Sequence, residues 1–424
     1  MQDIIQIANK IKANGGNIYL VGGAVRDKIL KQEIQDYDYC VTGLTQEEFC
    51  NLFPEAQKRG KFFSVFDLKG YEIALARKEY KTGIGHKQFQ IKTGKEITIQ
   101  EDLTRRDITI NAIAQDVLTG EIIDPFHGKQ DIENKTIRAT TNAFGEDPLR
   151  VYRVARFAST LQFLVEENTI KLMNSLKEEL ITLPKERIYE EFKKAIMSTK
   201  PSMFFEILKK TNVLDVHFKE INDLIGIPQP IQYHPEGDVF CHTMLALDKS
   251  AKLTNQLEIR YAVLVHDLGK ASTPKEILPH HYGHDKNGII LVKNLSNRIG
   301  VPKKWEKAGL IASIEHMRAR KFLQMKPAKQ VKFIEKIDKS VLGLEGMEIV
   351  AQCDYTNRQK SSNLSFAKIG NELIKKVNGK LIKDSYKGVN GVEFNNKLRE
   401  ERINWIKNNL QNCQKTIDNF IKKW

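Results

Sequence analysis

The sequence predicts an α/β head, built on a small mixed sheet with helices, followed by a mostly α-helical remainder. Residues 17–140 mix short runs of β-forming residues with helical stretches, whereas from about residue 146 apolar residues recur mainly at three- and four-residue spacing. A stretch rich in Pro and Gly, residues 226–238, is typical of a domain joint. We therefore predict four segments: a head (1–140), a helical neck (141–225), a histidine-rich domain (226–360) and a basic helical tail (361–424).

Local patterns predict the individual elements. Residues 1–16 have the pattern of a short amphipathic helix that Gly15 and Gly16 close. Strand candidates are the β-forming runs that end near Gly or Pro: 18–25, 62–68, 71–77 and 121–126. Helix candidates in the second part are 183–198 and 201–216, whose apolar residues share one helical face.

Composition excludes several classes of protein. The 424 residues are 41% hydrophobic and 28% charged, an ordinary balance for a soluble protein. No apolar run approaches the roughly 18–20 residues that a membrane helix needs, and the N-terminus lacks the order of a signal peptide. The five cysteines are scattered without a CxxC pair, which argues for a reducing compartment and against a zinc–thiolate site. We therefore expect a cytoplasmic protein with no membrane partner.

The charge indicates the kind of partner. Lys and Arg number 67 against 53 Asp and Glu, a net charge of +14, which favours polyanions and nucleic acid first. Residues 361–424 hold 13 Lys and Arg against 6 Asp and Glu, half of that excess. The alternative is a solvated lysine-rich surface from a genome biased toward Lys, Asn and Ile.

Two acids lie one residue apart in QDYDYCV, at the start of a predicted strand. Alternate strand residues share a face, so the carboxylates of Asp36 and Asp38 should point the same way and repel each other. A cation must therefore lie between them, unless they lie in bulk water as a solvated strand start. Mg²⁺, with water and phosphate oxygens, suits such a pair.

A strand, two glycines and a helix precede the acids in LVGGAVRD, residues 20–27. Gly22 and Gly23 let the backbone approach a phosphate closely, and Arg26 adds a charge-assisted bond. As structure alone, the same stretch is simply a tight turn. Together with the acid pair it suits a nucleoside triphosphate held through Mg²⁺, whose ions lower the pKa of an attacking hydroxyl and neutralise the leaving pyrophosphate.

GGAVRD followed by DYDYCV resembles the signature of the tRNA nucleotidyltransferases, the CCA-adding enzymes, of the bacterial class shared with poly(A) polymerases. EDLTRRDITINAIA (101–114) resembles the family's ribose-recognising motif, with Arg106 and Asp107 at its core. GEDPLRVYRVARF (145–157) resembles the motif that selects the base, and LPKERIYEEF (183–192) the neck motif. The motifs stand in the family's order, and the resemblance continues to about residue 360. It implies a polymerase-β-like head and an RNA-binding neck.

The resemblance also implies roles for single residues. Asp36 and Asp38 would be the catalytic Mg²⁺ ligands, and Asp147 with Arg150 would match the edge of cytosine or adenine, so that protein side chains act as the template. The expected nucleotide-binding residues are Gly23, Arg26, Arg106, Asp147, Arg150, Arg153 and Arg156. The residues alone also allow a capped, solvated helix, with Asp147 as N-cap before Pro148 and arginines paired with nearby glutamates.

Two further features of the head bear on the product. Residues 77–92 are polar and basic and contain glycine. At this place the family has a flexible loop that is needed for adding the final A. Because the loop has its full length in this sequence, the resemblance favours complete CCA synthesis. The alternative is an ordinary surface hairpin. Glu72, on the strand just before, is a candidate third carboxylate of the metal site.

Seven of the ten histidines fall between residues 234 and 316. An adjacent His266–Asp267 pair on an apolar helix is costly to bury unless a metal or partner satisfies it. The order of these residues resembles the HD family of metal-dependent phosphohydrolases, whose basic pattern is matched by His242, His266, Asp267 and Asp354. His284 and His316 match the added ligands of the family's two-metal members. His281 is a weaker candidate ligand. A divalent transition metal of unknown identity is implied. The alternative is a degenerate domain kept for packing.

The sequence therefore predicts template-independent addition and repair of the 3′-terminal CCA of tRNA from CTP and ATP. In the CCA-adding enzymes that carry it, the HD domain implies phosphatase, 2′-nucleotidase and 2′,3′-cyclic phosphodiesterase activities. The rival interpretations are a poly(A) polymerase, an HD phosphohydrolase with an inactive head, and a non-catalytic RNA-binding protein. The sequence does not fix the oligomeric state.

Overall fold

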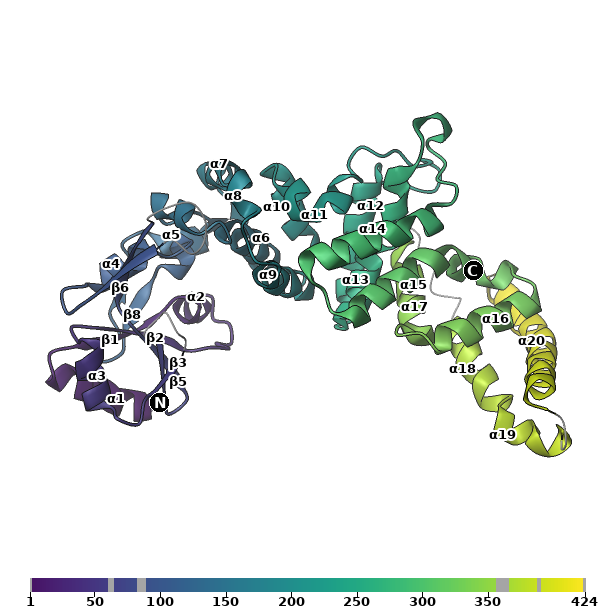
Figure 1. Cartoon of the computed structure of the whole chain (residues 1–424), viewed down its shortest axis with the longest axis horizontal. Coiled ribbons are helices and arrows are strands. Elements are labelled where there is room, and N and C mark those ends of the chain that lie inside the picture. The colour runs from purple at the N-terminus through teal and green to yellow at the C-terminus, as the bar shows by residue number, and fades with distance from the viewer. Residues whose placement is uncertain (1, 60–64, 82–88, 356–365, 387–389, 422–424) are drawn as a thin grey trace. The chain divides into compact units, whose positions relative to one another are not determined.

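The computed structural model describes the chain except residues 1, 60–64, 82–88, 356–365, 387–389 and 422–424. It divides into two compact units (Figure 1). The first comprises residues 1–195 and 203–216, and the second comprises residues 196–202 and 217–424. Three helices pass from one unit to the other: α9 (Lys185–Met197), α10 (Ser202–Lys210) and α11 (Leu214–Asn222).

A seven-stranded mixed sheet forms the centre of the head, as predicted. Its order is β3-β4-β5-β2-β1-β8-β9. Strand β2 pairs antiparallel with β1 and parallel with β5. The strands are β1 (Asn17–Val21), β2 (Asp38–Thr42), β3 (Gln57–Arg59), β4 (Val65–Leu68), β5 (Tyr71–Leu75), β8 (Ala114–Asp116) and β9 (Ile122–Ile123).

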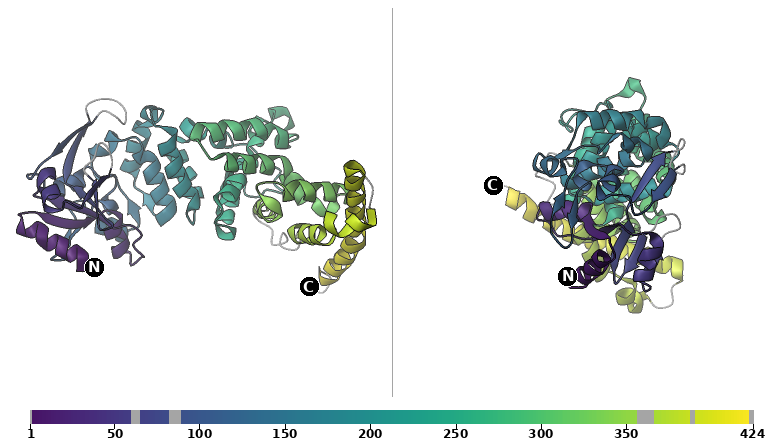
Figure 2. Two further views of the ribbon diagram at one scale, coloured as in Figure 1. Left: turned by 60° about the horizontal axis from the view of Figure 1, so that its bottom comes forward. Right: turned by 90° about the vertical axis from the view of Figure 1, so that its left-hand side faces the viewer.

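The other elements of the first unit lie next to this sheet or, later in the chain, form a group of helices to one side of it (Figure 2). Two pairs of short strands are β6 (Arg77–Lys81) with β7 (Phe89–Thr93), and β10 (Thr136–Ile137) with β11 (Leu164–Val165). The helices are α1 (Gln2–Ala13), α2 (Gly23–Ile29), α3 (Gln46–Leu52), α4 (Ile99–Thr104), α5 (Gly128–Glu133), α6 (Arg150–Leu161), α7 (Glu167–Ser175) and α8 (Lys177–Leu180), with 3₁₀ turns η1 (Thr109–Asn111) and η2 (Asn142–Glu146).

Local chemistry explains where these elements begin and end. Helix α1 buries Ile4, Ile7 and Ile11 on one face, and the chain leaves it through Gly15 at φ +83°, a conformation that glycine adopts without strain. Strand β2 buries every residue after Asp38, so the sheet is covered on both faces there.

The predicted strands are found with shorter bounds. The run 18–25 gives β1, which ends at Val21 because Gly22 turns the chain into α2. The run 121–126 gives only β9, and residues 62–64 of the second candidate, 62–68, lie outside the described residues.

The described part of the second unit has only helices as regular elements. They are α12 (Val239–Leu253), α13 (Leu257–Val265), α14 (His284–Ile299), α15 (Lys303–Arg320), α16 (Pro327–Asp338), α17 (Gly343–Cys353), α18 (Phe366–Lys376), α19 (Gly379–Ile382) and α20 (Gly391–Ile421), with 3₁₀ turns η3 (Leu268–Ser272), η4 (Lys275–Ile277), η5 (Phe322–Gln324) and η7 (Lys383–Tyr386). None of the described helices is both long and apolar enough to cross a membrane.

One apolar core joins these helices. It includes Ile259 of α13, Ala308 of α15, Met347 of α17 and Ile406 of the tail helix α20, all almost completely buried. The predicted joint, residues 226–238, lies inside this unit, where an isolated β-bridge between Pro228 and Asp238 closes it into a loop. Asp238 then caps α12 by accepting a hydrogen bond from the Cys241 amide at 2.8 Å.

Candidate active site and candidate metal centre

The acid pair lies at the exposed start of β2. Asp36 and Asp38 both line a pocket of about 760 Å³ in the first unit. Partial desolvation raises the pKa of Asp38; Arg106 opposes this rise and Asp36 adds to it. The two carboxylates therefore do face one cavity, where a cation bound between them relieves their repulsion.

The glycine turn forms the next wall of the pocket. Gly22 has φ +70°, and a Cβ at this position would lie 2.9 Å from Nη1 of Arg106. Arg26 donates from Nη1 to Oδ1 of Asn111 at 2.7 Å and from Nε to Oδ1 of Asp27 at 2.8 Å. The turn therefore leaves room for Arg106, and Arg26 is held at the pocket wall by its neighbours.

The motif at residues 101–114 contributes two buried acids. Asp102 accepts from Nη2 of Arg105 at 2.7 Å and from Nη2 of Arg106 at 3.3 Å. Asp107 accepts from Nε of Arg153 at 2.7 Å. Burial would raise the pKa of Asp107, but Arg153 outweighs burial and lowers it to about 2. These acids hold the cationic side of the pocket in place.

Helix α6 presents the three predicted arginines to the pocket, and each has a partner within the protein. Arg150 donates from Nη2 to the Arg105 carbonyl at 2.5 Å and from Nη1 to the Ala143 carbonyl. Arg156 donates from Nε to Glu191 at 2.5 Å and lies over the ring of Phe157 at 3.8 Å from its centroid. The alternative, in which the arginines pair with glutamates, describes Arg156, whereas Arg153 bonds to Asp107.

The predicted cap of this helix is wrong in detail. Helix α6 begins at Arg150 with Leu149 at its N-cap, because the amides of Arg150 and Val151 bond to carbonyls three residues earlier, at Asp147 and Pro148. Asp147 caps that tight turn instead, accepting from the Leu149 amide at 3.0 Å. Its other oxygen accepts from Nη2 of Arg187 at 2.7 Å.

The structure thus brings every predicted head residue to one pocket: Gly23, Arg26, Asp36, Asp38, Arg106, Asp147, Arg150, Arg153 and Arg156. Glu72 pairs directly opposite Asp38 across β2 and β5, but it does not line this pocket. The predicted loop 77–92 is the hairpin of β6 and β7, and its tip, 82–88, lies outside the described residues.

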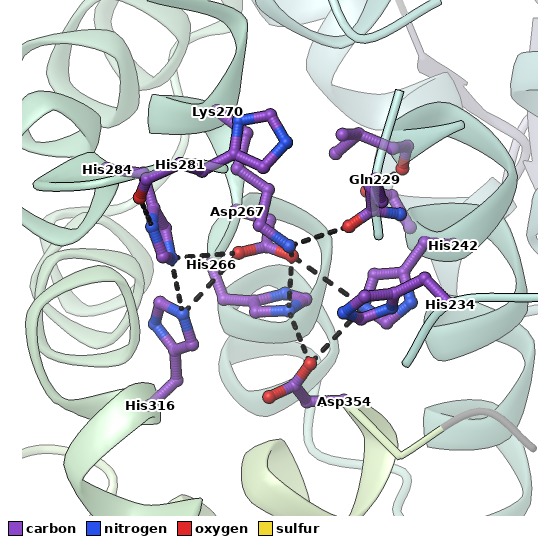
Figure 3. A network of polar contacts seen from close by, with 12 residues as sticks. Gln229, His234, His242, His266, Asp267, Lys270, His281, His284, His316 and Asp354 are labelled. Atoms are coloured by element: carbon purple, nitrogen blue, oxygen red, sulfur yellow. Dashed lines mark hydrogen bonds and ion pairs between the residues drawn. The ribbon is translucent and has the colours of Figure 1, made fainter. Parts of the chain in front are cut away.

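The HD-like residues converge from helix ends in the second unit (Figure 3). Nε2 of His242 lies 3.3 Å from Oδ1 of Asp354 and 3.6 Å from Oδ2 of Asp267. Nε2 of His266 lies 3.3 Å from the same Oδ2 of Asp267. We call this group of four, His242, His266, Asp267 and Asp354, position one; all four are buried.

A second group shares Asp267. Its other oxygen, Oδ1, lies 3.5 Å from Nε2 of His284 and 3.4 Å from Nε2 of His316, and these two nitrogens are 3.0 Å apart. We call Asp267, His284 and His316 position two. One carboxylate therefore faces both positions, as a ligand that bridges two ions would. His281 belongs to neither group: its Nε2 bonds to the Pro228 carbonyl at 3.0 Å.

The donor set fits a metal. In all four histidines Nδ1 bonds to an acceptor that has no hydrogen to give: the carbonyls of Val263, of His281, and of Ala312 and Ser313, and the carboxylate of Glu236. Nδ1 therefore carries a proton in each ring, and a neutral imidazole then directs its Nε2 lone pair at the cluster. Burial would lower the pKa of His266, but Asp267 and Asp354 raise it to about 10, so a metal at this position displaces a proton from His266. Buried atoms without a hydrogen-bond partner include Nε2 of His242 and His266 and Oδ1 of Asp267.

The electrostatics match an anionic cluster. Burial would raise the pKa of Asp267 and Asp354, but Lys270 and Arg320, respectively, hold both pKa values well below the usual range. Burial lowers the pKa of His316 to about 4. Lys270 lies 2.6 Å from Oδ2 of Asp267 and also donates to Gln229 at 2.8 Å.

Sequence reasoning missed the residues that hold these groups in place: Arg187 and Glu191 at the head pocket, and Gln229, Glu236, Lys270 and Arg320 at the metal centre. Lys270 stands three residues after Asp267, a spacing that could have been noticed. Glu236 stands six residues before His242, whereas the other four are 34 or more residues from their partners.

Comparisons with known families agree with this arrangement. The family described as "Poly A polymerase head domain" matches residues 18–138. "Probable RNA and SrmB- binding site of polymerase A" matches residues 162–225, and "HD domain" matches residues 239–414. The fold and its sites therefore define a nucleotidyltransferase head joined to an HD domain.

Curated relatives are more specific. The multifunctional CCA protein of Shewanella frigidimarina is 44% identical over 328 residues, covering 76% of this chain and 78% of the relative. That of Shewanella denitrificans is 41% identical over 401 residues, covering 91% and 96%. The chain belongs to the family of multifunctional CCA proteins, the CCA-adding tRNA nucleotidyltransferases.

Solved structures share the fold at low identity. The Thermotoga maritima CCA-adding enzyme complexed with tRNA aligns with a TM-score of 0.64 at 20% identity, over 97% of this chain and 94% of that one. The Bacillus stearothermophilus CCA-adding enzyme in complex with CTP aligns with a TM-score of 0.60 at 20% identity, over 98% of both chains.

Proposed function

We propose that this chain adds and repairs the 3′-terminal CCA of tRNA, using CTP and ATP. The observation that carries the proposal is one pocket of the head, which collects the acid pair, the glycine turn and the arginine helix. The curated relatives named multifunctional CCA proteins support it. We propose the four segments of the sequence prediction as its domains and the cytoplasm as its location.

Each wall of the pocket has a separate task in this reaction. Asp36 and Asp38 would hold Mg²⁺, and the bound ion would supply charge that makes the tRNA 3′-hydroxyl more acidic and neutralises the pyrophosphate. Gly23 and Arg26 bind the triphosphate, and Arg106 contacts the nucleotide beside them. Asp147 and Arg150 accept from and donate to the base edge, so that uracil or guanine leaves a buried group unpaired at a cost of about 1–3 kcal/mol. Catalysis is mainly positioning and charge neutralisation.

The test uses the purified protein and a tRNA that ends at its discriminator base, with Mg²⁺ and CTP, ATP or both. We expect two added residues with CTP alone and three with both nucleotides. An unbounded A tail would instead identify a poly(A) polymerase. Asp38→Asn should abolish incorporation, and incorporation that survives this change would remove the acid pair from the mechanism.

We propose a second activity for the metal centre, hydrolysis of phosphoesters with a bound divalent transition metal. The observation in its favour is the buried cluster, in which Asp267 belongs to both positions and the Nε2 atoms of the histidines point inward. His242, His266, Asp267 and Asp354 would hold one ion, and Asp267, His284 and His316 a second. Bound metal supplies a water activated for attack on phosphorus.

The test of the second activity offers 2′,3′-cyclic and 2′-nucleotides as substrates with Mn²⁺, Co²⁺ or Ni²⁺. We expect metal-dependent hydrolysis that Asp267→Asn removes and Asp38→Asn leaves intact. Absence of hydrolysis with every metal and substrate would favour the alternative of a domain kept for packing.

A further inference from the structure

The 226–238 loop reaches the metal centre from outside the ligand helices. Gln229 accepts from Lys270, which pairs with Asp267, and Glu236 contacts His242. The loop is fixed at its ends, since the Gly226 amide donates to Asp238 at 2.7 Å and Asp238 caps the helix that carries His242. A segment with the composition of a linker is therefore part of the surroundings of the cluster.

Glu236 is the buried acid of this loop. Its side chain is only 3% exposed, and Oε1 accepts from Nδ1 of His242 at 2.6 Å and from Nδ1 of His234 at 3.1 Å. The two imidazole rings meet edge to face, with centroids 4.7 Å apart and planes at 90°. Glu236 therefore fixes both the proton and the ring orientation of His242.

This acceptor sets His242 apart from the other histidines of the cluster. His266, His284 and His316 each donate from Nδ1 to backbone carbonyls three or four residues away. A carboxylate is a stronger acceptor than a carbonyl, so it leaves more electron density on the Nε2 that faces the metal. Position one also has four side-chain ligands, against three at position two.

We propose that Glu236 is a positioning residue for His242 and that it makes the two metal positions unequal, with position one binding a divalent transition metal more tightly than position two. This inference rests on the proposed metal-dependent function of the cluster. It assigns to the 226–238 loop a direct part in metal affinity.

The experiment titrates metal-free full-length protein with Co²⁺ in competition with a chromophoric chelator and records the visible spectrum of the bound ion. For the unmodified chain we expect a tight and a weak phase. Glu236→Gln should weaken the tight phase by about 10-fold, and Glu236→Ala by up to about 100-fold, the range for second-shell partners of metal ligands. The weak phase should be unchanged, and His284→Ala should remove the weak phase alone.

The matched control is Glu315→Gln. Glu315 is also a buried acid beside a ligand, His316, but it pairs with Arg318 at 3.1 Å and with Lys336 at 2.5 Å and has no histidine partner among the contacts of the described residues. This control separates the loss of a buried negative charge from the loss of the hydrogen bond to His242. We expect both Co²⁺ phases to match those of the unmodified chain.

The outcomes separate the inference from the function on which it rests. Equal Co²⁺ affinities for the unmodified chain and both Glu236 variants would overturn the inference and leave the proposed function standing. Failure of the unmodified chain to bind Co²⁺ would overturn the proposed metal-dependent function of the cluster itself. Equal weakening of both phases, together with a lower thermal midpoint of the metal-free protein, would show a merely structural role and also overturn the inference.

Discussion

At the scale of the residue, the head pocket is defined by pairs that join distant parts of the sequence. Arg156 meets Glu191 across 35 residues, and Arg187 meets Asp147 across 40. Spacing and family resemblance identified Asp147 and Arg156, because both belong to one short sequence motif. The partners were missed because no local pattern shows which acid a folded helix will bring to which arginine.

The Asp107–Arg153 pair makes stability depend on pH. Asp107 has a folded pKa of about 2 against an ordinary value of 3.8. A carboxyl group whose pKa is lowered by folding stabilises the protein at every pH above its ordinary pKa, here by about 2 kcal/mol. This contribution is lost as the pH falls through the folded pKa of about 2. Denaturant unfolding should therefore show Asp107→Asn less stable by about this amount at pH 6, with the difference almost gone at pH 2. A difference independent of pH would contradict the pairing.

Arg187 should affect nucleotide choice although it lies outside the base-selecting motif. Arg187→Ala frees the carboxylate of Asp147, and we expect kcat/KM for CTP and ATP to fall about 10- to 100-fold, the cost of one or two charge-assisted bonds. Misincorporation of UTP should rise. Arg138→Ala is the control, since Arg138 pairs with Asp131 and does not line the pocket. Equal effects of the two changes would count against this role.

At the scale of the element, the order of strands and helices in the head followed from alternation and from glycine breaks. The exact ends did not follow. Helix α6 starts at Arg150 because a tight turn precedes it, and β1 stops at Val21 because Gly22 takes a positive φ. Such boundaries depend on backbone geometry that side-chain pattern alone does not encode.

Substitutions at Gly22 and Gly15 separate the effect of backbone strain from the effect of a steric contact in the pocket. Gly22→Ala and Gly15→Ala both force an L residue to positive φ, and each should cost about 1–3 kcal/mol of stability, more at Gly22, whose ψ of −135° lies outside the left-handed helical region. A Cβ at Gly22 also meets Arg106 at 2.9 Å, whereas at Gly15 nothing lies within 4 Å. We therefore expect nucleotide incorporation to fall strongly only for Gly22→Ala, measured with matched amounts of folded protein. Equal activity of both variants would show that Arg106 moves aside at no cost.

At the scale of the whole molecule, the two units hold separate chemistries. The three tryptophans, at 305, 405 and 424, all belong to the second unit, and so does the metal centre. Net charge predicted the polyanion partner, and the spacing of apolar residues predicted the helical second half. Residues 196–202 and 203–216 interleave between the two units, and no shift in composition marks this exchange.

This division predicts a selective response to ligands. Tryptophan fluorescence reports the second unit alone, so Co²⁺ at about 100 times its Kd should raise the fluorescence-detected Tm by about 5–10 °C, equivalent to about 2.7 kcal/mol. CTP should leave this Tm unchanged. In calorimetry, CTP should instead raise the midpoint of the transition in which the first unit unfolds. Removal of metal with a chelator should reverse the first shift. A CTP effect on tryptophan fluorescence would contradict the separation.

In the head pocket, the arginines on α6 already donate hydrogen bonds to acceptors of the chain itself. Part of each guanidinium is therefore held by the chain itself, at Asp107, Glu191 and the carbonyls of Ala143 and Arg105. Because a nucleotide offers several acceptors in fixed positions, we expect it to compete with these internal partners better than a simple inorganic anion does. The pocket should consequently discriminate against abundant small anions.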